Sequence, residues 1–408
     1  MRIEDLFLKG ESSYVYMERY VNNGSPSGFD KVHTSSEGTA PRGSNTSFSL
    51  PIIRFDEHIA IDTIGADPLS MEAQCLFCHP DNLNNAILLD VKDHWKIVGE
   101  IQVSPTASAR TVKWIGHDYF IKLDYMGYLG RITRNLDYQR LLSAYEVSRD
   151  LKSGVDSNLY NDKFALQDES KGKVAHIPTK NGKTYEFGYV LREAAPYSCL
   201  KNENLFLVPA FSLFGTDINA PTDDPIIIQL YKKSNLDIND FAYECLLRPI
   251  ISCYFDPLIH HGLAMESHAQ NTLIAIDAKF NILLVVARDM ESVDKDLPLR
   301  ESLDVESPIT SIGYKCLKKD DYNYRIKHSF MFDFKLGEYL IGPLLEVLST
   351  IGSFRKNQIV EKIKALSSEF ISRLPDDYFP SSWYSYDNIQ FVPDERRPYI
   401  RHDNPKYR

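Results

Sequence analysis

The sequence predicts an α+β fold, with mixed and antiparallel sheets in its first half and a mostly helical C-terminal part. Two observations indicate this class. Segments of the first half alternate apolar and polar residues, as strands do, whereas the last third repeats apolar residues at helical spacing. The chain has 408 residues, of which 43% are hydrophobic, so it can fill sizeable cores and is expected to form two or three subdomains.

Strands are expected along the first half. PIIRFDEHIAIDTI alternates like a hairpin, and WKIVGEIQVSP predicts a strand that ends at Pro105. TVKWIGHDYFIKLDY predicts two strands joined at Gly116–Asp118. TYEFGYVLREAAP predicts a further strand, with Arg192 and Glu193 at its end.

Helices are expected on both sides of these strands. An N-terminal helix precedes a Gly-, Ser-, Asn- and Pro-rich segment, residues 21–49, which we expect to be a mobile loop. Residues 131–149 have a helical period. Near the C-terminus, DFAYECLLRPIISCYFDPLIHHGLAMESHAQNTLIAI suggests two helices with a break near Pro257. NILLVVARDM predicts a buried strand, and LGEYLIGPLLEVLSTIG and KNQIVEKIKALSSEFISRL predict the closing helices.

Three regions follow from these elements. Residues 1–95 form an N-terminal region with the Gly/Ser-rich loop, residues 96–237 a β-rich subdomain, and residues 238–408 a mostly helical subdomain. The second boundary is placed where mixed strands give way to helices, near Asn235–Asp240.

Composition excludes several classes of partner. A net charge of -10 argues against non-specific binding of nucleic acid, which needs an excess of Lys and Arg. No run approaches the roughly 18 apolar residues of a membrane helix, and the N-terminus lacks the apolar core of a signal peptide. Six cysteines are too few for a disulfide scaffold, so we expect a cytoplasmic protein without membrane or nucleic-acid partners.

One short motif, CLFCH at Cys75–His79, has competing interpretations. It matches the c-type haem attachment pattern, but that chemistry requires export. As half of a zinc site it lacks a second Cys/His pair at the usual spacing, because Cys245 and Cys253 are too far apart to form one. Buried structural thiols are the favoured interpretation.

A polar cluster interrupts the apolar run HGLAMESHAQNTLIAI. Glu266, His268, Gln270 and Asn271 could be a satisfied core histidine with capping or solvent-facing neighbours, but each buried polar group without a partner costs about 1–3 kcal/mol. If this segment is helical, Glu266 and Gln270 share one face, while His268 and Asn271 share another. With Asp289 at the end of the buried strand, these oxygen-bearing side chains suit Mg²⁺ and phosphate.

A second set of hydroxyls and cations surrounds the predicted hairpin. Such groups could bind an anion, with Arg pairing with a carboxylate and Lys with a phosphate, or they could be ordinary solvated surface residues. There is no GxxxxGK[ST] loop and no kinase-type catalytic loop. The set comprises Ser104, Thr106, Ser108, Arg110, Lys122 on the returning strand, and Arg131 and Arg134 at the start of the expected helix.

The order of these motifs resembles the NRPS-independent siderophore (NIS) synthetase family, of the aerobactin-synthetase type. The resemblance covers residues 70–350. It rests on Gly262 followed by Glu-x-His-x-Gln-Asn, on the strand ending in Arg288–Asp289, on PTASART before Lys122, on Arg134 twelve positions later, and on LREAAP. The chain resembles a short member of the family with a trimmed N-terminal region.

The resemblance implies a hand-like fold with a central basic cleft. It implies an ATP- and Mg²⁺-dependent ligase that adenylates a carboxylate, typically of citrate, and condenses it with an amine or hydroxyl, releasing AMP and pyrophosphate. By position, the ATP-binding residues are Thr106, Ser108, Arg110, Lys122, Arg192 and Gln270. The metal ligands are Glu266, Asn271 and Asp289, and the catalytic residues that orient the carboxylate are Arg134 and His268.

Two departures from the family keep alternatives open. The family's paired His-Pro segment is reduced to His79–Pro80, and Gly130 stands where the family often has a substrate-contacting Thr, which puts citrate in doubt. One alternative is a phosphotransferase using the same cleft. Another is a catalytically lapsed relative that binds a carboxylate metabolite or a ferric chelate. The carboxylate, the nucleophile, the product and the oligomeric state stay open, although family members are commonly homodimers.

Overall fold

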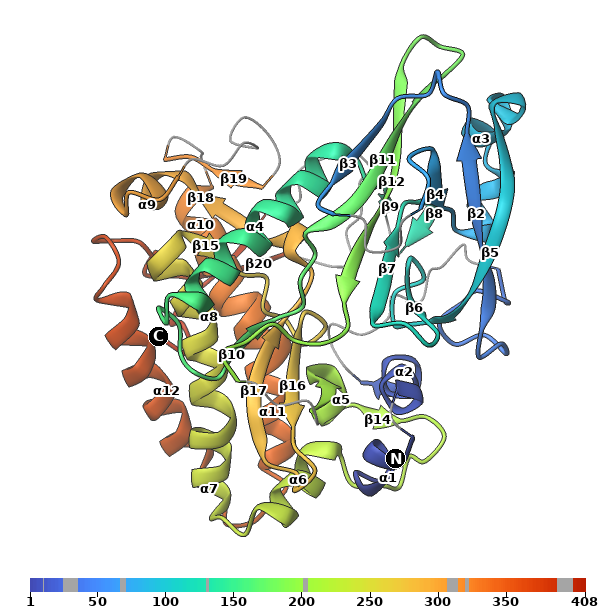
Figure 1. Ribbon diagram of the computed structural model, residues 1–408. Helices are drawn as coiled ribbons and strands as arrows, with labels where there is room; N and C mark the ends of the chain where they lie inside the picture. The colour runs from blue at the N-terminus through green and yellow to red at the C-terminus, as the bar shows by residue number, and fades with distance from the viewer. Residues whose placement is uncertain are drawn as a thin grey trace.

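A large curled antiparallel sheet lies beside a mostly helical part in this computed structural model, and α4 (Tyr138–Asp156) runs between them (Figure 1). The structure describes residues 1–9, 11–24, 36–66, 71–129, 132–200, 205–306, 315–319, 323–386 and 399–408. The predicted α+β class is confirmed. Among the helices in these ranges, none combines the length and the apolar character that a membrane crossing requires.

Within the described residues, the large sheet has eight strands in the order β3-β11-β12-β7-β6-β5-β2-β4, and all neighbours are antiparallel. Because sequential strands β5, β6 and β7 are neighbours, the segments PTASART and FIKLDY meet at one hairpin. The strands are β2 (Phe48–Phe55), β3 (Ile61–Ile64), β4 (Cys75–Phe77), β5 (Trp95–Pro105), β6 (Thr111–Trp114), β7 (Tyr119–Leu123), β11 (Lys171–Pro178) and β12 (Thr184–Glu193).

The strand predictions for the first half are largely confirmed, including the end of β5 at Pro105 and the turn between β6 and β7. The predicted hairpin in PIIRFDEHIAIDTI is wrong. Its halves form β2 and β3, but β2 pairs with β4 and β5, and β3 pairs with β11 at the far edge. The alternation indicated strands correctly, but it carries no information on which strand is the partner.

A second sheet, in the order β10-β17-β16-β13, lies within the helical part. Its strands come from both sides of residue 237, the predicted boundary between the second and third regions. The predicted division into three regions stays a prediction. Its strands are β10 (Phe164–Leu166), β13 (Phe206–Pro209), β16 (Thr272–Ile276) and β17 (Ile282–Ala287). The smaller sheets comprise β15 (Leu263–Ala264), β18 (Asp294–Asp296) and β19 (Cys316–Leu317); β1 (Val21–Asn23) and β14 (Thr216–Asp217); β8 (Tyr125–Leu129) and β9 (Ile132–Arg134); β20 (Trp383–Tyr386) and β21 (Tyr399–His402).

Most helices pack around this second sheet. The longest are α4, α8 (Arg248–His261), the π-helix η5 (Phe330–Ile341) and α12 (Lys356–Ile371). The other helices and helical turns are α1 (Glu4–Lys9), α2 (Glu11–Tyr20), η1 (Pro80–Asn84), α3 (Ala86–Asp90), η2 (Lys92–His94), α5 (Ala210–Phe214), α6 (Ile226–Ser234), α7 (Ile238–Asp240), η3 (Phe241–Leu247), η4 (Met290–Ser292), α9 (Leu297–Ser302), α10 (Tyr324–Ser329) and α11 (Gly342–Leu348).

Three helix predictions need correction. Pro257 lies inside α8 without ending it, although an interior proline costs a hydrogen bond and crowds the preceding turn; most residues of α8 are buried, so packing on both sides of Pro257 stabilises the continuous helix. The helix instead ends at Gly262, whose φ of 59° is left-handed, so residues 263–276 are short strands and a loop. The helix expected from residue 131 begins at Tyr138, and Arg134 ends β9; Arg131 lies outside the described residues.

The expected loop at residues 21–49 is ordered in part. Val21–Asn23 form β1, and residues 25–35 lie outside the described ranges. Beyond them, the buried Arg19 side chain donates hydrogen bonds to three backbone carbonyls, at Pro41, Gly43 and Asn45. A single guanidinium therefore organises a stretch whose composition predicts mobility.

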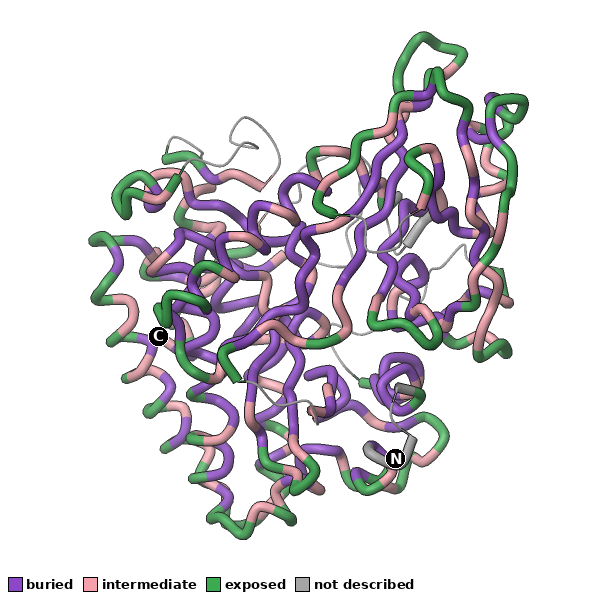
Figure 2. The backbone as a smooth tube through the Cα atoms, in the orientation of Figure 1, coloured by how far each residue is buried: buried purple, intermediate pink, exposed green. Residues whose placement is uncertain are grey.

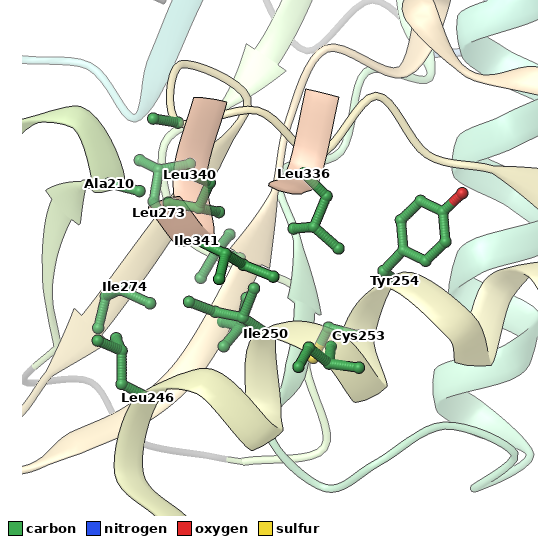
Figure 3. Close-up of a cluster of buried hydrophobic side chains, with 14 of the residues drawn as sticks. Ala210, Leu246, Ile250, Cys253, Tyr254, Leu273, Ile274, Leu336, Leu340 and Ile341 are labelled. Carbon is green, nitrogen blue, oxygen red and sulfur yellow. The ribbon is translucent and has the colours of Figure 1, made fainter. Parts of the chain in front are cut away.

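The main hydrophobic core lies between the second sheet and the helices around it. Figure 2 shows buried backbone concentrated there and along the strands of the large sheet. In the close-up of Figure 3, side chains from α8, β16 and η5 fill the space between these elements, among them Ile250, Ile274 and Leu340. The large sheet has a core of its own, formed mainly by side chains from its strands.

Candidate active site

The β6–β7 hairpin and the end of β17 meet at a buried ion pair. The Lys122 ammonium, on β7 and 2% exposed, contacts the carboxylate of Asp289 and lies 3.2 Å from that of Glu291. These residues are 167 and more positions apart in the chain. The structure thus brings the predicted cationic hairpin and the predicted acidic strand end together at one place.

Two arginines and one more acid complete this cation–carboxylate cluster, defined as Arg110, Lys122, Glu169, Arg192, Asp289 and Glu291. Arg110 lies 2.6 Å from Glu291, and Arg192 lies 3.3 Å from Asp289 and also pairs with Glu169. Glu169 accepts hydrogen bonds from the backbone N–H groups of Asp289 and Met290, at 3.3 and 3.0 Å. Three cations and three carboxylates therefore share one buried network.

The backbone at Asp289 is unusual. Its φ of 71° and ψ of 57° are left-handed, which is uncommon for a residue other than glycine and is typical of functional sites. Burial by itself would raise the pKa of the Asp289 carboxyl, but Lys122, Arg192 and Arg110 lower it on balance. The same opposition lowers the pKa of Glu291, through Lys122 and Arg110. Both carboxyls are therefore ionised at neutral pH.

Arg288 points into a different network from its neighbour Asp289. Its guanidinium donates to the Tyr14 hydroxyl at 2.7 Å and pairs with Glu18, and its Nε donates to the Gln270 carbonyl at 2.6 Å. Glu18 also accepts from the Ala107 backbone N–H, at 3.2 Å. Helix α2 thereby ties the strand end, the 262–271 loop and the hairpin turn to one another.

The loop after α8 carries the predicted polar cluster. Glu266 pairs with Lys335 of η5 at 2.8 Å; burial would raise the pKa of Glu266, but Lys335 and His268 lower it on balance. The Asn271 amide donates to the Ser292 hydroxyl at 3.4 Å, and that hydroxyl donates to the Asp289 carbonyl at 2.7 Å. The expected placement of these residues on two faces of a helix is wrong, because they lie in a loop between β15 and β16.

His268 is neutral in this environment. Burial lowers the pKa of its imidazole to about 4, although Glu266 opposes the shift. The backbone N–H of Gln270 donates to Nδ1 at 3.2 Å, so Nδ1 is the acceptor and the ring proton is on Nε2. Nε2–H is then available to donate to an oxygen of a bound carboxylate.

Replacing His268 by glutamine is expected to flatten the pH dependence of stability. The unfolded state takes up a proton near pH 6.5 but the folded state only near pH 4, so wild-type stability falls as pH drops through this window. At pH 5 the deficit from this group is about 2 kcal/mol. Urea denaturation at pH 7 and pH 5 should show the loss in wild type and in a His117→Gln control, but a smaller loss in His268→Gln. Equal losses in all three proteins would contradict this assignment.

Arg134 faces the same region from β9. It is exposed to solvent, yet protein surrounds it closely enough that burial lowers the pKa of its guanidinium, while Asp289, Glu291 and Glu266 act in the opposite direction. The Arg134 backbone carbonyl accepts from Arg110 at 3.4 Å, which links β9 to the cluster.

The hydroxyl residues of the hairpin lie beside this cluster. Thr106 is 3% exposed and donates to the Thr111 carbonyl at 2.7 Å, so its hydroxyl shapes the turn before β6. Ser108 is half-buried, and its carbonyl accepts from the Thr111 backbone N–H. The Gln270 carbonyl is held by Arg288, as above. Nucleotide binding by these three residues stays a prediction, and Gly130 lies outside the described residues.

Four acidic or basic residues of this region were missed by the sequence analysis: Glu18, Glu169, Glu291 and Lys335. Glu291 stood two positions after Asp289 and was the easiest to find. Glu169 and Lys335 lie in LQDES and MFDFKLG, where local sequence offers no signal, because their partners are distant in the chain.

The structure shows the state of the two cysteines in the CLFCH segment. Cys75 and Cys78 are buried free thiols, with Cys75 on β4, as the favoured interpretation predicted. Burial raises the pKa of the Cys78 thiol and lowers that of the His79 imidazole to about 4.

Comparison by sequence finds nothing: no protein-family model matches the chain, and no curated protein does. Comparison by structure finds clear similarities. Petrobactin biosynthesis protein AsbB from Bacillus anthracis str. Sterne superposes with a TM-score of 0.73 at 15% identity, covering 97% of this chain and 75% of AsbB.

Two aerobactin synthetases from a hypervirulent pathotype of Klebsiella pneumoniae are also similar. ATP-bound IucA gives a TM-score of 0.71 at 14% identity, over 98% of this chain and 80% of IucA. IucC gives 0.65 at 14% identity, over 85% of this chain and 66% of IucC. The chain therefore has an NIS synthetase-type fold, as the motif order predicted.

Proposed function

We propose that this chain is an ATP- and Mg²⁺-dependent synthetase that adenylates a polycarboxylate and joins it to an amine or hydroxyl in siderophore or related metabolite biosynthesis. The observation that carries the proposal is the cation–carboxylate cluster, in which Lys122 bridges Asp289 and Glu291 between Arg110 and Arg192. The fold also supports the proposal, because the similar structures AsbB, IucA and IucC are named for siderophore synthesis and the IucA structure is ATP-bound.

The donor set of the cluster suits Mg²⁺. This ion prefers oxygen ligands from one or two carboxylates together with phosphate oxygens. Asp289 and Glu291 are ionised, and Oε2 of Glu291 is a buried oxygen with no hydrogen-bond partner in the described part of the chain. Glu266 and the Asn271 amide oxygen are the further candidate ligands. When bound, Mg²⁺ would neutralise phosphate charge.

The cations of the cluster suit a polyphosphate. Arg110, Lys122 and Arg192 now balance carboxylates, and nucleotide phosphates would offer them a second set of anions. Because the site is buried, their charges are weakly screened, which favours binding of an anion and stabilises charge that develops on the α-phosphate. Arg134 and the Nε2–H of His268 would hold the substrate carboxylate against that phosphate.

The chemistry then divides into two balanced steps. A carboxylate oxygen attacks the α-phosphorus of ATP, the bond to the β-phosphate breaks, and pyrophosphate leaves. An amine or hydroxyl next attacks the acyl carbon, forms the amide or ester, and releases AMP and a proton. No covalent bond to the protein is required, so positioning of the two anions is the main contribution of the site.

A product assay tests the proposal. The protein is incubated with ATP, Mg²⁺, a panel of polycarboxylates and hydroxylamine, and we expect AMP, pyrophosphate and a hydroxamate with at least one acid. Asp289→Asn should abolish all three products, whereas the exposed control Asp376→Asn should retain them. ADP as the product would indicate the phosphotransferase instead. Chelate or carboxylate binding without Mg·ATP binding would indicate a lapsed relative.

A further inference from the structure

We propose that Asp56, His58 and His94 form a binding site for a first-row divalent metal ion such as Zn²⁺, separate from the candidate active site. One ligand atom from each side chain lies within 4.8 Å of the other two. Within the described ranges, this is the only group of three His, Cys, Asp or Glu side chains that meets that condition. None of its three residues belongs to the candidate active site.

The large sheet holds these ligands in place. Asp56 follows β2 and His94 precedes β5, and the last pair of that ladder, Phe55 opposite Trp95, sets the two ligands side by side. The Asp56 backbone N–H donates to the His94 carbonyl at 3.0 Å. His58 follows two positions later, in the turn closed by a hydrogen bond to the Asp56 carbonyl. The arrangement is therefore built by backbone hydrogen bonds.

The distance between two of the ligand atoms is close to that in a tetrahedral site. His94 Nδ1 and Asp56 Oδ2 are 3.2 Å apart, and ligand atoms about 2.0–2.2 Å from a tetrahedral zinc are themselves separated by about 3.3–3.6 Å. The rings of His58 and His94 meet edge-on, with centroids 4.6 Å apart and an interplanar angle of 83°. Because the three ligand atoms lie within 4.8 Å of one another, binding would require the side chains to move closer to tetrahedral separation.

The donor set selects the class of ion. Two imidazoles and one carboxylate suit Zn²⁺, Ni²⁺ or Cu²⁺, whereas Mg²⁺ and Ca²⁺ favour all-oxygen sites. The side chains of Asp56 and His94 are 54% and 47% exposed, so an ion can enter from solvent and a fourth position stays open to water. Without a metal, the same contact would be an ordinary surface ion pair, and the experiment must separate these two cases.

Calorimetric titration of the full chain with ZnCl₂ makes this distinction. Wild type is expected to bind one equivalent at this site. Because loss of an outer-shell partner already weakens metal sites about 10- to 100-fold, His58→Ala and His94→Ala should each weaken binding at least about tenfold. The matched control is His176→Ala, since His176 lies 2.8 Å from Asp62 and 3.6 Å from Glu186 without a second imidazole in the group. That control should bind as wild type does.

Thermal unfolding gives an independent readout. Zn²⁺ should raise the Tm of wild type and of the His176→Ala control, because it binds only the folded chain. The two site variants should keep the wild-type Tm in EDTA and lose the Zn²⁺-dependent increase. The proposal is overturned if the His58→Ala/His94→Ala double variant binds the same number of Zn²⁺ ions with unchanged affinity, or if wild type binds none.

Discussion

Alanine in place of Arg134 is expected to lower turnover at saturating ATP by at least about 10²-fold, the usual cost of removing one oriented donor that acts on the reacting groups. Binding of Mg·ATP should be unchanged. Turnover is followed by pyrophosphate release and nucleotide affinity by calorimetry. The prediction separates a residue that holds the carboxylate from residues that hold the nucleotide.

The position of Arg134 explains why its effect should fall on turnover. Arg134 is exposed at the end of β9. Burial lowers the pKa of its guanidinium and the charges of Asp289, Glu291 and Glu266 raise it, but the side chain is not part of the Lys122 ion pairs. Its truncation therefore leaves those pairs intact. Lysine at this position should restore only part of the activity, because an ammonium lacks the planar fork that pairs with a carboxylate.

A matched control is Arg140→Ala. Arg140 pairs with Asp137 in the first turn of α4, six positions from Arg134, and its loss should leave turnover near the wild-type value. If Arg134→Ala lost ATP affinity and turnover by the same factor, Arg134 would belong to the nucleotide site. If it lost neither, the proposed carboxylate site would be elsewhere.

Methionine in place of Lys122 is expected to lower the free energy of unfolding by about 3–5 kcal/mol, as when one partner of a buried ion pair is removed. The change leaves Asp289 and Glu291 facing each other without the ammonium that contacts both. Urea denaturation of the two proteins at pH 7 measures the difference. Turnover should also be lost, because Lys122 is a proposed phosphate ligand.

The pH dependence of the difference in unfolding free energy between wild type and Lys122→Met tests whether the lost ion pairs cause it. In wild type the lowered pKa of Asp289 stabilises the folded state at pH values above the usual carboxyl pKa. This stabilisation is lost as pH falls through and below the usual carboxyl pKa. In Lys122→Met the stabilisation is smaller, because only Arg192 and Arg110 still lower that pKa, and protonation of one carboxyl relieves the repulsion. The deficit should therefore shrink as pH falls from 7 into and below the usual carboxyl range, around pH 4 and lower. Lys113→Met on the neighbouring strand keeps the Lys122 pairs, so its deficit should not shrink in this way. A pH-independent deficit in Lys122→Met would point to lost packing instead.

Local patterns were sufficient for much of the β-sheet. Alternation in WKIVGEIQVSP and TVKWIGHDYFIKLDY located β5, β6 and β7, because the side-chain period of two is a property of each strand alone. The same alternation gave no pairing partner for β3, whose neighbour β11 begins more than a hundred residues later. Strand pairing depends on long-range contacts that a single sequence does not contain.

The segment HGLAMESHAQNTLIAI shows the same limit at the site. Its residue types indicated a polar site, but its apolar spacing fits a helix and a strand about equally well, and the left-handed turn at Gly262 decided between them. A Cβ at this position would lie 2.6 Å from the Arg300 side chain, so the turn is fixed by packing against a distant element.

By itself, the sequence indicated the α+β class and the residue types that suit phosphate and Mg²⁺, and its resemblance to the NIS synthetase family predicted that the hairpin and the strand end lie together. Only the tertiary structure decided how these charges are balanced: Lys122 between Asp289 and Glu291, Glu169 on Arg192, and Glu18 on Arg288. The physical reason is that a buried charge requires a partner within a few ångströms. In a folded chain that partner comes from whichever element packs there, at any distance along the sequence.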